Sequence, residues 1–154
     1  MDCLCDEKWM RAALEQAILA RDMGEIPIGA VVVRNGELIA SAHNLCETEH
    51  TATAHAEILA VDRACRTLGT TRLSDCTLYV TLEPCPMCAG ALIRARLGRV
   101  VFAAKDPRAG AFGSLINLNA YPLESHPACE HGLLAEESLT LLRDFFEKMR
   151  KKTK

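Results

Sequence analysis

The segment from residue 76 to residue 104 most constrains the fold, because it reads as strand, helix and strand with little loop between them. The run CTLYVTL is rich in β-branched and aromatic residues, PMCAGALIRARL reads as a helix that Gly98 ends, and RVVFAA reads as a second strand. Two strands joined by a helix lie parallel in one sheet, connected by a right-handed crossover. The segment therefore predicts a layered α/β structure.

The rest of the chain extends this pattern. The runs IGAVVV and LIASA flank Asn35-Gly36, a dipeptide typical of hairpin turns, so they predict an antiparallel pair of strands. Polar residues predict a loop over residues 44–54, and a glycine-containing loop with one short turn of helix is expected over residues 105–119. Helices are expected over residues 7–23 and 55–68. Residues 132–152 are expected to form a short extended piece followed by a helix.

This order of elements predicts a three-layer α/β/α sandwich around a mixed sheet of about five strands. No internal repeat, low-complexity tract or linker divides the sequence. Residues 1–154 are therefore interpreted as one domain, a length that suits a single hydrophobic core.

Composition and charge are those of a globular protein. Hydrophobic residues make up 49% of the chain, and no apolar run reaches the roughly 20 residues of a membrane span. The N-terminus, MDCLCDEKWM, lacks the features of a secretory signal peptide, which predicts a cytoplasmic protein without a membrane partner. Because the net charge is −2, nucleic-acid binding would need a local basic patch, and the segment EKMRKKTK is a candidate. From charge alone, the favoured interpretation of this segment is a solvated helix end.

Eight cysteines are many for a chain of this kind, and they favour metal or catalytic use over disulfides. Cys85 and Cys88 lie at the start of one predicted helix, and His55 and Glu57 lie at the start of another. Helix starts that follow neighbouring strands open onto one edge of a sheet, so we expect these residues to converge. One imidazole and two thiolates would bind zinc with a fourth position open to water, and Glu57 would serve as general acid and base.

Two other interpretations of the cysteine pair are open. A Cys-x-x-Cys at a strand-to-helix junction also suits a dithiol redox site, although such a site has no need of the upstream His-x-Glu pair. A structural zinc closed by a fourth ligand, with His50, Cys46 or Glu57 as candidates, would make the protein a zinc-stabilised binding module. The three-ligand set favours catalysis over both.

The combination of TAHAE and EPCPMC resembles the zinc-dependent nucleoside and nucleobase deaminases. GEIPIGAVVV, HNL, TLYVTLEPCPMCAGALIRARLGRVVFAAKDPRAGAFGS and GLLAEE…LLRDFFEKMR extend it to the bacterial tRNA-specific adenosine deaminases over nearly the whole chain. The resemblance implies a cytidine-deaminase-like fold and a homodimer that converts the wobble adenosine of a tRNA anticodon stem-loop to inosine. It also implies one zinc ion per subunit on His55, Cys85 and Cys88, with Glu57 as the catalytic proton shuttle.

The resemblance further implies substrate contacts. Asn44 matches the position that hydrogen-bonds the base, although Asn is also a common turn residue. Asp106 matches a position that meets the nucleotide backbone, and its alternative role is to start a turn. Leu82 occupies a position that is often aromatic and would pack against a flipped base. Lys105, Arg108 and the basic tail would then face RNA phosphates.

Several features depart from the family or match nothing in it. Thr51-Ala52 stands where the family often has Asp-Pro, and a leucine at position 82 stacks on a base less well than an aromatic ring. Guanine, cytosine and cytidine deaminases share the zinc motif, so a free nucleobase or nucleoside is the alternative substrate. Cys65 is expected in the core, and no role is predicted for Arg94, Arg96, Arg99, Cys3, Cys5, Cys46, Cys76 and Cys129.

Overall fold

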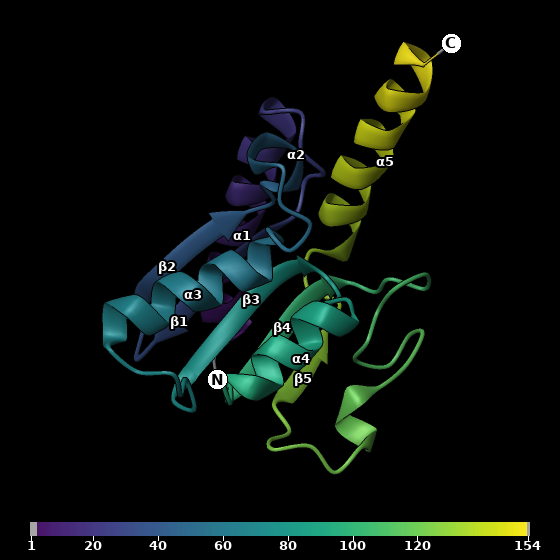
Figure 1. The fold of residues 1–154 in the computed structure, drawn as a ribbon. Coiled ribbons are helices and arrows are strands. Elements are labelled where there is room, and N and C mark those ends of the chain that lie inside the picture. The colour runs from purple at the N-terminus through teal and green to yellow at the C-terminus, as the bar shows by residue number, and fades with distance from the viewer. Residues whose placement is uncertain (1–2, 154) are drawn as a thin grey trace.

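Helices cover both faces of one five-stranded sheet (Figure 1). This computed structural model describes residues 3–153, and the side chains of Cys3 and Leu4 lie outside the described part. No helix within residues 3–153 is long and apolar enough to cross a membrane. The strands are β1 (Gly29–Arg34), β2 (Glu37–His43), β3 (Cys76–Leu82), β4 (Arg99–Ala104) and β5 (Ala128–His131). The helices are α1 (Cys3–Asp22), α2 (Cys46–Glu49), α3 (Ala56–Leu68), α4 (Pro86–Arg94), the 3-10 helix η1 (Leu118–Ala120) and α5 (Ala135–Lys152).

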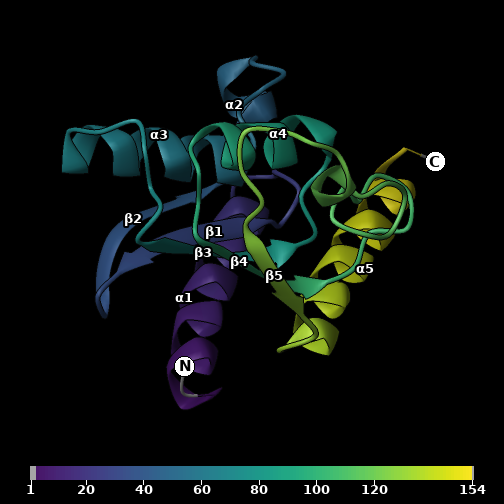
Figure 2. The ribbon, with the colours of Figure 1, turned by 90° about the horizontal axis from the view of Figure 1, so that it is seen from below.

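The sheet lies between two helical layers. Figure 2 shows α3 and α4 on one face of the sheet and α1 and α5 on the other. Alternate residues of β1 face opposite layers: Ala30 and Val32 join the apolar cluster beneath α3 and α4, whereas Val31 and Val33 pack against α1. Because both faces are covered, this strand is apolar at successive positions instead of alternating with polar residues.

The sheet is mixed, with strand order β2-β1-β3-β4-β5. β1 pairs antiparallel with β2 and β3, whereas β3 with β4 and β4 with β5 are parallel pairs. Asn35 and Gly36 join β1 to β2 with φ angles of 51° and 74°, the left-handed conformation that a tight hairpin turn requires. The predicted hairpin and mixed sheet are confirmed.

The prediction that Gly98 ends the helix between β3 and β4 is wrong. α4 ends at Arg94, and Arg96, with φ of 57°, takes the left-handed conformation that often follows a helix. A Cβ atom at Gly98 would lie only 2.4 Å from the carbonyl oxygen of Ser74. The glycine is therefore required by close packing of two chain segments and not by the helix end.

Two short elements differ from the predicted layout. The segment expected to be a loop after Asn44 contains α2, a helix of four residues. The extended piece expected after residue 131 lies earlier, as the edge strand β5, whose side chains are mostly exposed. Both elements are too short or too exposed to show an apolar periodicity in the sequence.

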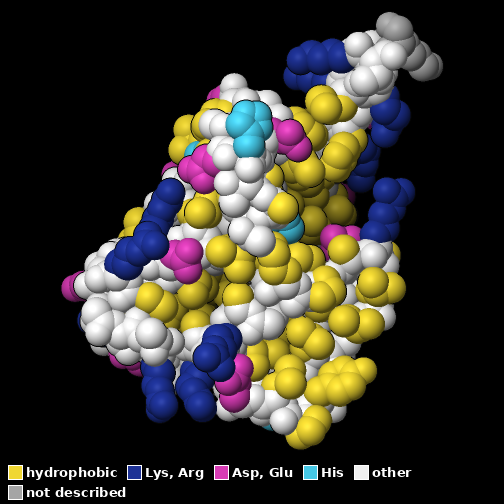
Figure 3. Space-filling model, viewed as in Figure 1, with side chains coloured by type: hydrophobic (Ala, Val, Ile, Leu, Met, Phe, Trp, Pro, Cys, Tyr) yellow, Lys and Arg dark blue, Asp and Glu magenta, His cyan; other side chains and the backbone are white. Residues whose placement is uncertain are grey.

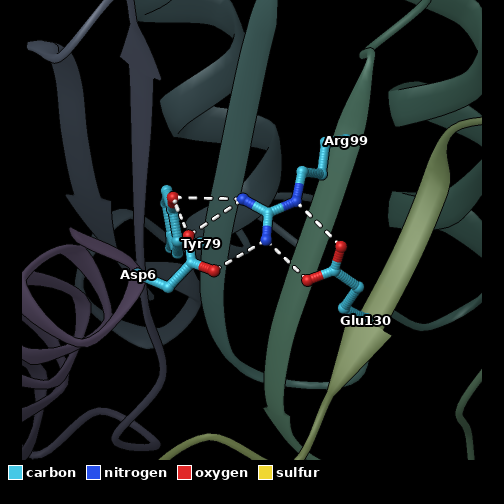
Figure 4. A network of polar contacts seen from close by, with 4 residues as sticks. All are labelled: Asp6, Tyr79, Arg99 and Glu130. Atoms are coloured by element: carbon cyan, nitrogen blue, oxygen red, sulfur yellow. Dashed lines mark hydrogen bonds and ion pairs between the residues drawn. The ribbon is translucent and has the colours of Figure 1, made fainter. Parts of the chain in front are cut away.

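A buried polar network ties α1 to the sheet (Figure 4). The guanidinium of Arg99 donates to both carboxylate oxygens of Asp6, at 2.9 and 2.7 Å, and also pairs with Glu130. The Tyr79 hydroxyl donates to Asp6 at 2.7 Å. Arg99 and Asp6 have side chains only 13% and 12% exposed, so Arg99 is a structural residue of the fold and not a free surface cation.

Asp6→Asn is expected to lower the free energy of unfolding by about 3 kcal/mol at neutral pH, because it breaks a largely buried, bidentate ion pair. The hydrogen bond from Arg99 holds the pKa of Asp6 below its ordinary value of 3.8. A carboxyl group whose pKa is lower in the folded state adds stability above its unfolded pKa and loses that contribution as pH falls through the folded value. Urea unfolding of the unmodified protein and of Asp6→Asn should be measured across pH. The difference between their free energies of unfolding should shrink in acid, and a difference independent of pH would contradict this.

Candidate metal and active site

Three potential ligands meet where two helices begin. His55 immediately precedes α3, and Cys85 immediately precedes α4, with Pro86 as the first residue of that helix. The Nδ1 atom of His55 lies 3.7 Å from the sulfur of Cys85 and 3.4 Å from the sulfur of Cys88. The structure therefore brings together the two helix starts, as the strand–helix order leads one to expect.

The geometry of these three residues fits a zinc ion. Zinc bonds of about 2.3 Å to sulfur and about 2.0 Å to nitrogen place sulfur and nitrogen about 3.5 Å apart around a tetrahedral ion. The two sulfur–nitrogen distances lie close to that value, and the ligand atoms all lie within 4.8 Å of one another. A donor set of one imidazole and two thiols also binds zinc in preference to harder cations.

The charge of the cluster suits a cation. The hydrogen bond from the Cys88 thiol lowers the pKa of Cys85 to about 4, and the same contact raises the pKa of Cys88. The hydrogen bond with Cys85 raises the pKa of His55. The exposed backbone N–H groups at the start of α4 add a positive potential that favours thiolate. Cys85 is thus held as a thiolate, the form in which cysteine ligates a metal.

No fourth ligand from the described part of the chain completes the cluster. Among residues 3–153, the only group of three or more metal-binding side chains in ligand geometry is His55, Cys85 and Cys88. Cys46 instead directs its thiol to the carbonyl oxygen of Ala52 at 3.9 Å. The arrangement therefore fits an open site better than a closed structural one, and the neighbouring histidine and glutamate fit a redox dithiol poorly.

Glu57 lies in the first turn of α3, beside the cluster but outside its ligand set. It is 4% exposed, and burial raises the pKa of its carboxyl group to about 7. A carboxyl group with a pKa near neutrality can both accept and return a proton at physiological pH. This is the property required of a general acid and base next to an activated water.

Asn44 is more than a turn residue. Its side chain is buried, and Oδ1 accepts the N–H of Ala56 at 2.9 Å, which places the amide next to His55 at the start of α3. The amide nitrogen Nδ2 has no acceptor among the described residues. The side chain is thus fixed through its oxygen, and its nitrogen is left to donate to a ligand.

Leu82 and Asp106 line a separate groove of about 630 Å³ between the end of the sheet and α5. Oδ1 of Asp106 accepts the N–H groups of Arg108 and Ala109, so its side chain starts a turn, as the alternative interpretation proposed. Leu82 is half-buried. Four cations surround them in the same groove: Lys105, Arg108, Arg143 and Arg150.

Sequence reasoning missed two buried carboxylates that hold loops near the site. Glu25 accepts the N–H groups of Glu47 and Thr48 and so fixes α2, which follows Asn44. Glu83 lies between β3 and the metal-binding cysteines and is 2% exposed. For Glu83 the available signal was an acidic residue placed directly after an apolar strand.

A model of the MafB19-like deaminase family matches residues 5–150, almost the whole chain. The chain belongs to this deaminase family. The tRNA-specific adenosine deaminase of Bacillus subtilis (strain 168) is 53% identical to this family member over 150 residues, covering 97% of this chain and 93% of the relative.

Two solved structures share the fold of this deaminase. One comes from a study of A-to-I editing by tRNA:A34 deaminases at the wobble position of transfer RNA; it is 41% identical, has a TM-score of 0.85, and the match covers 88% of this chain and 99% of that one. The other, a guanine deaminase from Nitrosomonas europaea, is 29% identical with a TM-score of 0.78, over 90% of this chain and 83% of that one. The predicted α/β/α fold of the cytidine-deaminase type is confirmed.

Proposed function

We propose that this protein hydrolytically deaminates the wobble adenosine of a tRNA anticodon to inosine. The carrying observation is the His55, Cys85 and Cys88 cluster beside buried Glu57, in a chain 53% identical over nearly its whole length to a tRNA-specific adenosine deaminase. The cluster alone supports a deaminase, and the relatives support tRNA adenosine as its substrate.

In this proposal His55, Cys85 and Cys88 hold one zinc ion per subunit, and each remaining step belongs to a named side chain. When bound, zinc supplies the Lewis acidity that makes water nucleophilic near neutral pH. With zinc bound, Glu57 would take one proton from the water and pass it to N1 of adenine as the water oxygen bonds to C6. Glu57 would then take the second proton from the new hydroxyl group and pass it to the exocyclic nitrogen, so that the carbon–nitrogen bond breaks, ammonia leaves, and the product keeps C6=O and N1–H. The free amide nitrogen of Asn44 donates to the base and orients it.

The groove beside the site suits RNA better than a free base. Its walls carry Lys105, Arg108, Arg143 and Arg150, whereas Leu82 offers apolar contact to a flipped nucleotide. The basic end of α5 projects from the body, and Figure 3 shows Lys and Arg side chains along it. We assign phosphate contacts to these cations and a nucleotide-backbone contact to Asp106.

We further propose that residues 1–154 act as one domain in a cytoplasmic homodimer. Support for a dimer comes from apolar side chains gathered over the 110–125 segment in Figure 3, where Leu115, Tyr121 and Leu123 are exposed. A cytoplasmic location follows from a tRNA substrate. Sedimentation equilibrium should give twice the mass of one chain, and the mass of a single chain would refute the dimer.

Purified protein should form inosine in an anticodon stem-loop RNA with adenosine at the wobble position, and none in the same RNA with guanosine there. The second candidate is deamination of a free base or nucleoside, favoured by the likeness to a guanine deaminase. Mass spectrometry of parallel reactions with stem-loop, guanine, cytosine and cytidine separates the two. Binding of the RNA should weaken as salt rises, with a log–log slope of about −0.7 per phosphate contact. Turnover of guanine or cytidine, with none of the RNA, would overturn the proposal.

A further inference from the structure

One carboxylate joins the metal-binding turn to the wall of the groove. Glu83 follows β3 directly, precedes Cys85 by two residues, and is 2% exposed. Its Oε1 accepts the N–H of Asp106 at 3.1 Å and the hydroxyl of Ser114. Its Oε2 accepts the N–H groups of Phe112 and Ser114, each at 3.1 Å. Four donors from residues 106–114 therefore converge on a single side chain.

The 105–114 segment fits closely around this carboxylate. A Cβ atom at Gly110 would lie 2.3 Å from Cδ and 2.4 Å from Oε2 of Glu83, so only glycine can occupy that position. Ala111 adds a backbone bond of 2.8 Å to the carbonyl oxygen of Pro84. The segment is thus held by the residues that lead directly into the metal-binding cysteines.

The contacts of Glu83 are made to neutral donors. None of the ion pairs described within residues 3–153 includes this carboxylate. A buried carboxylate without hydrogen bonds would be strongly unfavourable, and here backbone N–H groups satisfy it in place of a cation. The contact therefore shapes a loop, because three of its four donors are backbone N–H groups whose positions define the path of the chain.

The 105–114 segment is one wall of the cationic groove, through Lys105, Asp106 and Arg108. Leu82, the neighbour of Glu83, lines the same groove. We propose that Glu83 is a positioning residue. Its carboxylate holds the 105–114 segment against the turn that carries the metal-binding cysteines, so that RNA binds in the correct position. The kinetic part of this inference rests on the proposed function, whereas the structural part does not.

Hydrogen exchange of Glu83→Gln tests the tether without any substrate. A glutamine offers one acceptor oxygen and turns an NH2 group toward the N–H donors, so part of the four-fold contact is lost. The amides of Phe112 and Ser114 should exchange about tenfold faster than in the unmodified protein. Glu25→Gln is the matched control, because it frees the amides of Glu47 and Thr48 and should leave residues 112 and 114 unchanged.

Kinetics on the anticodon stem-loop test the consequence for function. Glu83→Gln should raise KM about tenfold, keep kcat within about threefold, and retain one zinc per chain, because substrate seating and not chemistry is affected. A simple loss of folded protein would instead lower kcat at unchanged KM. Should Glu83→Gln fail to fold, Ser114→Ala removes one donor of the four and should raise KM about threefold.

Three outcomes would overturn the inference: unchanged exchange at Phe112 and Ser114, a fall in kcat with unchanged KM in a variant that is fully folded, or loss of zinc from Glu83→Gln. Absence of RNA turnover by the unmodified protein would instead refute the proposed function. The exchange comparison would still decide whether Glu83 holds the 105–114 segment.

Discussion

Glu57→Ala is expected to lower the rate of deamination by a factor of about 10²–10⁴ while the protein keeps its zinc and its fold. The reason is that the proton taken from water must reach the leaving nitrogen, and Glu57 is the buried carboxyl group beside the ligand cluster. Removal of a buried carboxylate also removes its desolvation cost, which offsets the packing that is lost. The thermal midpoint should therefore remain close to that of the unmodified protein.

The measurement is single-turnover inosine formation, with zinc determined by atomic emission on the same samples. Glu57→Gln should lose as much activity as Glu57→Ala, since an amide preserves the shape but neither accepts nor releases a proton near neutral pH. Glu49→Ala, which removes an exposed glutamate from α2, is the control and should keep full activity. A near-normal rate in Glu57→Ala would show that the proton shuttle lies elsewhere.

Cys88→Ala is expected to lose zinc and to unfold more readily. Zinc ties the start of α4 to the start of α3, so its binding free energy contributes to folding. With free zinc at about 1,000 times its dissociation constant, that contribution is about 4 kcal/mol. Denaturant unfolding should be measured with and without a chelator. Once zinc is removed, the free energy of unfolding of the unmodified protein should fall to that of the variant.

Cys76→Ala is the matched control for this experiment. Cys76 is also a buried cysteine, 2% exposed, but it belongs to the apolar cluster and lies outside the ligand set. Its replacement by alanine likewise removes one buried sulfur atom, and it should leave one zinc per chain, with only a small packing loss. A Cys88→Ala protein that stays stable and metal-replete would contradict ligation by that residue.

Strand positions were predictable where apolar runs are bounded by polar residues. β3 and β4 coincide with CTLYVTL and RVVFAA, because the interior strands of a sheet covered on both faces must be apolar at nearly every position. The edge strand β5 lacks that requirement and was misplaced. The end of α4 was also misplaced, because Gly98 is required by its close contact with the backbone of Ser74, and no local sequence pattern reveals that contact.

The candidate site was predictable to the extent that its residues are close in sequence. His55 with Glu57 and Cys85 with Cys88 are short local spacings at helix starts, and strand–helix order alone brings helix starts to one edge of a sheet. The amide of Asn44 was expected to meet a base, yet its bond to Ala56 at the start of α3 was not foreseen. That bond depends on how a loop folds back onto a helix.

By itself, the sequence determined the order of elements, the layered α/β architecture and the spacing of the metal-binding residues, because these follow from local periodicity and turn chemistry. Only the tertiary structure decided that Arg99 is an internal partner of Asp6, 93 residues away, and that Glu83 binds backbone groups 23 to 31 residues downstream. Such contacts join a side chain to backbone or charge from a distant segment. They leave no periodic trace in the sequence and exist only once packing has brought the two segments together.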